Sequence, residues 1–321
     1  MFLVKKFKFT MERGLELVNK EELNSYIEEK IQHFSKYENY SSKEERLKLL
    51  DEIVQMCDYD KNNAIFDYTA LPSFEGFNIA DKEPHMIYYF NLAFILGGIF
   101  LNVFDKEKNR IARVEDGISG AINTRSMFLR AYDELIRCKN DNLKPAYGAT
   151  LIFATLIEKD IKDRTKIIYA QRYLADLKAG IDAGRITLTS EENKLYDFLQ
   201  FQYGIIQSRT TTANFNPIIA CTQMQYDLFL KYNIVPTNDR DIANLLCNKI
   251  TLNQLLQSQA FKNIADDRFV AFATLLFGTS SVNLRNDLAH CNTAYSNYYS
   301  IHITALLFAL FTMVSDESFL K

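Results

Sequence analysis

The sequence predicts an all-α protein, and three observations lead to that expectation. Only 11 glycines and 5 prolines occur among 321 residues, so few positions interrupt helices. Apolar residues make up 48% of the chain and aromatic residues 13%, which is ample for a full core. Amphipathic, helix-like segments recur along the chain, whereas strand signals are almost absent.

The N-terminal region, residues 1–140, is expected to be helical and to have a role that its sequence does not indicate. Ser42-Lys43-Glu44-Glu45 has the pattern of a capping box and predicts the start of a helix. Asp58-x-Asp60-x-Asn62 begins like a calcium loop, but Asn63 stands where glycine is needed, so we expect a loop with capping Asx residues. The helices expected in this region cover 21–34, 43–57, 86–104 and 114–138.

Residues 86–104 raise the question of a membrane span. The segment has no charge over 19 residues and is long enough to cross a bilayer. Asn91 and Asn102 interrupt it, and the charges at its two ends show no clear Lys/Arg bias. We therefore expect a buried core helix and no membrane association, with a membrane-attached sensor as the alternative.

The second predicted domain covers residues 141–321. A polar stretch at 139–148, which contains Pro145, is the best candidate for the boundary. Helices dominate the remaining chain and end at glycine, proline and asparagine positions. We expect them at 149–163, 166–179, 190–207, 218–232, 241–258, 261–277 and 298–314.

Charge and cysteine content limit the function classes. The net charge is −3 and no Lys/Arg block occurs, which argues against a broad nucleic-acid-binding surface. The five cysteines are scattered without a C-x-x-C pair, as is typical of reduced thiols in the cytoplasm. The four histidines stand far apart, so the sequence predicts no metal site.

One short segment carries the chemistry. Between Arg268 and Asp316 the only formal charges are Arg285 and Asp287, and His290 follows closely. If Asn283 caps a helix, Arg285 lies in its first turn, where unsatisfied N–H groups attract anions. An arginine for phosphate charge and a histidine for proton transfer then predict a phosphodiester site, although an ordinary capping or core histidine is the alternative.

Arg285-Asn286-Asp287-Leu288-Ala289-His290 resembles the R-N-x-x-x-H signature of the HEPN superfamily. That resemblance implies a HEPN-like helical bundle with metal-independent endoribonuclease activity, in which the 2′-hydroxyl of RNA attacks the adjacent phosphorus. It implies Arg285, Asn286 and His290 as catalytic residues, tRNA or mRNA as the substrate, no cofactor, and a homodimer with two motifs face to face. It also implies a cytoplasmic defence effector or toxin, with a partner or sensor protein.

A different class of function competes with the enzyme. The close variant of the motif continues with glycine after the histidine, whereas Cys291 follows His290 in this chain. This departure and the net acidity favour a HEPN-like bundle that cuts no RNA and serves in dimerisation or nucleotide sensing.

Overall fold

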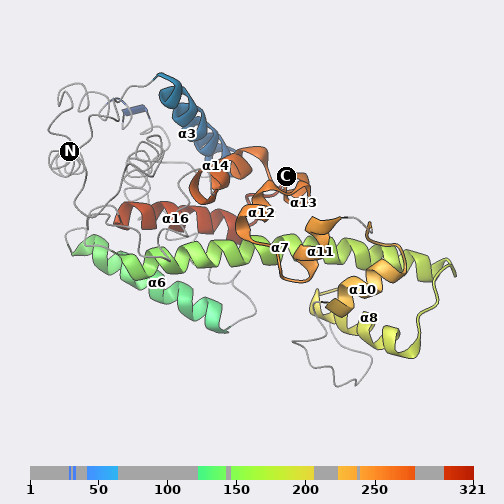
Figure 1. The fold of residues 1–321 in the computed structure, drawn as a ribbon. Coiled ribbons are helices and arrows are strands. Elements are labelled where there is room, and N and C mark those ends of the chain that lie inside the picture. Colours follow the sequence, from blue (N-terminus) through green and yellow to red (C-terminus); the bar gives the residue numbers. More distant parts are fainter. Residues whose placement is uncertain are drawn as a thin grey trace. The chain divides into compact units, whose positions relative to one another are not determined.

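A computed structural model describes 42–63, 122–141, 146–205, 223–236, 239–278 and 300–321, together with Glu29, Gln32 and His33 (Figure 1). Most of these residues belong to helices. The β-type pairing found within these ranges is a single antiparallel bridge between Ala265 and Leu320. The predicted all-α fold class is confirmed, whereas the expected core helix at 86–104 lies outside the described residues.

The chain forms two compact units, Met1–Glu158 with Ala265–Lys321 and Lys159–Ile264. The domain boundary expected at 140/141 stays a prediction. The first unit contains the described helices α3 (Lys43–Asn63), α6 (Ile122–Asn140), α14 (Asp267–Phe277) and α16 (Ser300–Ser315). Helix α6, which precedes the expected boundary, packs against α16, which follows it. Polar, helix-breaking residues in a sequence indicate where helices end, but they do not indicate which helices pack in the same core.

The core of the first unit is rich in phenylalanine. Phe128 of α6, Phe153 of α7 (Tyr147–Asp182) and Phe308 and Phe311 of α16 have ring centroids 5.4–6.5 Å apart. All four side chains are buried. Helix α16 contains no charged residue, and a helix that is apolar on every side is expected to be buried.

Helix α3 begins where its sequence predicts. The backbone N–H of Glu45 donates to Ser42 Oγ at 3.2 Å, and the backbone N–H of Ser42 donates to Glu45 Oε2 at 3.0 Å. The predicted capping box is thus confirmed. The helix continues to Asn63, so the loop expected at 58–63 is wrong. Asp and Asn are only mildly unfavourable inside a helix, so their presence alone does not end one.

Two helices expected at 149–163 and 166–179 are one continuous helix, α7, whose residues belong to both units. The polar residues between them do not break it. Lys159 and Asp163 form an i,i+4 ion pair of 2.6 Å, and the buried Thr165 hydroxyl donates to the Ile161 carbonyl at 2.7 Å. Polar side chains that bond within their own helix allow it to continue.

Among the remaining described helices, several expected segments are shorter or divided. The segment 241–258 is divided at Asn248, whose φ of 56° lies in the left-handed region. Asparagine tolerates this backbone conformation better than most residues. The segment 261–277 is divided before Asp266, whose side chain caps a new helix. The helices are α8 (Ser190–Gln202), α10 (Gln223–Lys231), α11 (Arg240–Leu246), α12 (Leu252–Gln257) and α13 (Gln259–Ile264).

Candidate functional site

The predicted site residues Arg285, Asn286 and His290 lie within 279–299, outside the described residues. Their neighbours along the chain are described. Helix α14 ends at Phe277 with Gly278 as its C-cap, and α16 begins at Ser300. Both helices belong to the first unit, so one compact unit supplies both attachments of the motif segment.

The start of α14 and the residues after α16 are joined directly. The backbone N–H of Asp266 donates to the Phe319 carbonyl at 2.8 Å, beside the Ala265–Leu320 bridge. The Phe319 ring is fully buried, with its centroid 5.2 Å from that of Phe269. These contacts hold the two flanking helices together at the ends that do not lead into the motif segment.

The apolar flanks of the motif are largely used in the core of the chain itself. Phe269, Phe272 and Leu276 of α14 are buried, and so are most described side chains of α16. The apolar content of 269–315 therefore gives no argument for a subunit interface along these flanks. The expected homodimer stays a prediction of the family resemblance and of the paired acid and base that such chemistry benefits from.

Arg268, the second residue of α14, forms ion pairs with two carboxylates. Its Nη1 and Nη2 donate to the carboxylate of Glu44 at 2.6 and 3.1 Å, and its Nε and Nη2 donate to that of Asp266 at 3.0 and 2.9 Å. These bonds to Arg268 lower the pKa of both carboxyl groups and raise that of the guanidinium. Since its nitrogens are already used, Arg268 is a structural fork between α3 and α14 and is poorly suited to bind phosphate.

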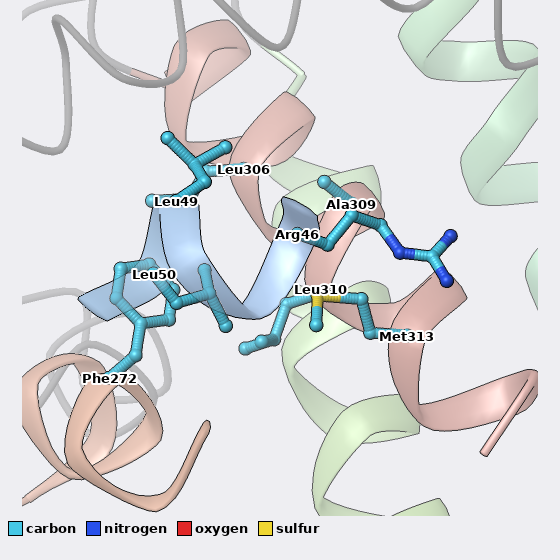
Figure 2. Close-up of a pocket in the computed structure, with 8 residues that line it drawn as sticks. All are labelled: Arg46, Leu49, Leu50, Phe272, Leu306, Ala309, Leu310 and Met313. Carbon is cyan, nitrogen blue, oxygen red and sulfur yellow. The ribbon is translucent and has the colours of Figure 1, made fainter. Parts of the chain in front are cut away.

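A second arginine, Arg46 of α3, lies beside a small cavity between α3, α14 and α16 (Figure 2). Its Nη2 donates to Ser318 Oγ at 2.7 Å and lies 3.5 Å from the Asp316 carboxylate. The guanidinium extends away from the apolar lining residues in Figure 2. The cavity volume of about 10 Å³ is close to the minimum for one water molecule, so this is a packing gap and no substrate site. The lining residues are Arg46, Leu49, Leu50, Phe272, Leu306, Ala309, Leu310 and Met313.

The second unit contains a polar cluster that the sequence analysis did not anticipate. Glu192 completes a capping box with Thr189, forms a 2.5 Å ion pair with Lys231 and accepts from the Tyr232 hydroxyl at 2.9 Å. The bond to Lys231 is the main cause of a Glu192 pKa lowered to about 2. A carboxylate that stays ionised and fully bonded is a poor general base, so the cluster ties α8 to the end of α10. The signal in the sequence was the T-x-x-E spacing of Thr189 and Glu192.

Other reactive groups in the described ranges are structural. Cys138 and Cys247 are buried and form no disulfide, and burial raises the pKa of both thiols, which makes them unreactive. Within these ranges no group of three or more His, Cys, Asp or Glu side chains could hold a metal ion. No described helix combines the length and apolar character needed to cross a membrane.

Comparisons of the chain with protein-family models, curated proteins and solved structures found no match. The described residues thus contribute two anchored helices on either side of the motif segment. The chemistry of that segment is inferred from its sequence.

Proposed function

We propose that this protein is a metal-independent endoribonuclease of the HEPN type, acting in the cytoplasm as a defence effector or toxin. The observation that carries the proposal is the R-N-x-x-x-H motif, Arg285 to His290, which includes the only two formal charges of the stretch 269–315. Charged side chains are rarely buried unless they are paired, so charged residues in an apolar stretch indicate a partner or a functional site.

The described helices that flank the motif along the chain are compatible with this assignment. The motif connects α14 to α16, as the helix–motif–helix arrangement of the family requires. Arg268 and Arg46 in the same unit already bind carboxylates. Arg285 is therefore a better candidate than either of them for binding a substrate phosphate.

Each motif residue has a distinct role in the proposed reaction. The 2′-hydroxyl of RNA attacks the adjacent phosphorus, the P–O5′ bond breaks, and the products carry a cyclic 2′,3′-phosphate and a 5′-hydroxyl. His290 moves a proton to or from the reacting oxygens, and Arg285 stabilises charge on the phosphoryl oxygens. Asn286 orients the phosphate or the imidazole. No metal or other cofactor takes part in these steps.

The charge of the chain limits how it meets RNA. A net charge of −3 without a basic block gives little long-range attraction to a polyanion. We therefore expect weak RNA binding by the isolated chain and recognition of tRNA or mRNA at a local site. A partner or sensor protein would then deliver the substrate or the activating signal.

The direct test is cleavage of total RNA and of tRNA in EDTA by the purified protein. His290→Ala should lower the cleavage rate by about 10² to 10⁴-fold, the usual contribution of general acid–base catalysis. Arg285→Lys should also be impaired, because an ammonium group cannot replace a planar fork that binds two phosphoryl oxygens.

Two matched variants control for the loss of an imidazole or a guanidinium as such. His33 is half exposed, and its Nε2 lies 3.1 Å from Glu52 Oε2. Arg185 is exposed in the turn after α7. His33→Ala and Arg185→Lys should keep full cleavage. Equal losses in the controls, or cleavage by His290→Ala at the wild-type rate, would contradict the assignment.

The non-catalytic alternative makes a different prediction for the same variants. The net acidity and Cys291 after His290 favour a dimerisation or nucleotide-sensing module. In that case Arg285 and His290 are structural, and their replacement lowers the melting temperature or splits a dimer. A wild type that never cleaves RNA, combined with destabilised motif variants, would favour this module over the enzyme.

The proposed mechanism also predicts an assembly. One motif supplies one imidazole, whereas the reaction benefits from both an acid and a base. We expect a twofold symmetric homodimer that brings the two copies of 285–290 together. Light scattering at micromolar concentration tests this; a monomer that cleaves RNA would exclude a shared site.

A further inference from the structure

We draw no further inference here: the strongest candidate, the exposed apolar side chains Phe201, Ile205 and Met224 where the end of α8 meets the start of α10, carries nothing because nothing in the structure shows what covers them.

Discussion

The two units achieve helical structure in different ways. In the first unit, α6 and α16 have 19 and 16 residues and meet through buried phenylalanines. In the second unit, α10 to α13 have only 6 to 9 residues each. Side chains cap the starts of several of its helices, with Thr189, Asp239, Thr251 and Ser258 as the acceptors.

The difference follows from the cost of starting a helix. The first turn fixes several residues for one hydrogen bond, so a six-residue helix has few bonds to offset that cost. A capping side chain satisfies one of the four free N–H groups, which is a large share of the bonds in a helix so short. A long apolar helix depends mainly on burial instead. The stability of the first unit should thus depend most on its buried core side chains. The stability of the second unit should depend more on its helix caps.

The largest effect is expected in the core of the first unit. Phe311 is fully buried, with ring centroids 5.4 Å from Phe128 and 6.1 Å from Phe153. Phe311→Ala should lower the free energy of unfolding by about 3–5 kcal/mol through lost burial and a new cavity. Phe201→Ala, at a side chain that is 44% exposed, is the control and should cost far less. Chemical denaturation of both variants measures the difference.

Hydrogen exchange on the same variant shows whether the two units are independent. Loss of protection in α6 and α16 with unchanged protection in α11 and α12 would support separate stabilities. Equal losses of protection in all four helices would show that the two units unfold together and have no separate stabilities.

The helical secondary structure could largely be predicted from the sequence, whereas the packing partners of each helix could not. The start of α3 was predictable because the capping-box bonds join Ser42 and Glu45, which lie only three positions apart in the sequence. The continuity of α7 through Asp163 was not, because it depends on which polar residues find partners within the helix. The division at Asn248 was missed because asparagine is compatible with both helical and left-handed backbone.

The candidate site shows the same limit. The motif could be found because its residue types and spacing are local in sequence. The Arg268–Glu44 fork joins residues 224 positions apart, and nothing in either local sequence indicates the partner. The burial of the apolar flanks in the core of the chain was equally inaccessible, since it depends on how α3, α6 and α16 pack.

A smaller effect is expected from removing a cap in the second unit. The backbone N–H of Gln254 donates to Thr251 Oγ1 at 3.2 Å, and Gln254 Oε1 accepts from the backbone N–H of Thr251 at 2.9 Å. Thr251→Ala should lower the free energy of unfolding by about 1 kcal/mol. Thr251→Ser keeps the hydroxyl and should restore most of that loss. If the alanine variant is as stable as the wild type, the caps do not explain how the short helices persist.

The smallest effect concerns the acid sensitivity of the second unit. Glu192 has a pKa of about 2 in the folded chain against an ordinary value of 4.5, chiefly because of its bond to Lys231. A carboxyl group whose pKa is lowered by folding contributes stability above its unfolded pKa and loses it as the pH falls through the folded value. The contribution of Glu192 should therefore be complete above about pH 4.5 and disappear towards pH 2. Lys231 is half exposed, so the pair is screened by solvent.

Glu192→Gln should consequently destabilise the protein at pH 7 by a few tenths to about 1 kcal/mol. Its unfolding curve should converge with that of the wild type near the pKa of about 2. Glu191→Gln removes the same charge from the same turn of α8 and leaves the bonds of Glu192 in place, so it should keep the wild-type pH dependence. The carboxyl groups of Glu44 and Asp266 in the first unit also have lowered pKa values, but they are present in all three proteins and cancel in the difference. A constant gap between wild type and Glu192→Gln from pH 7 to pH 2 would show that the difference in stability does not come from the charge on Glu192.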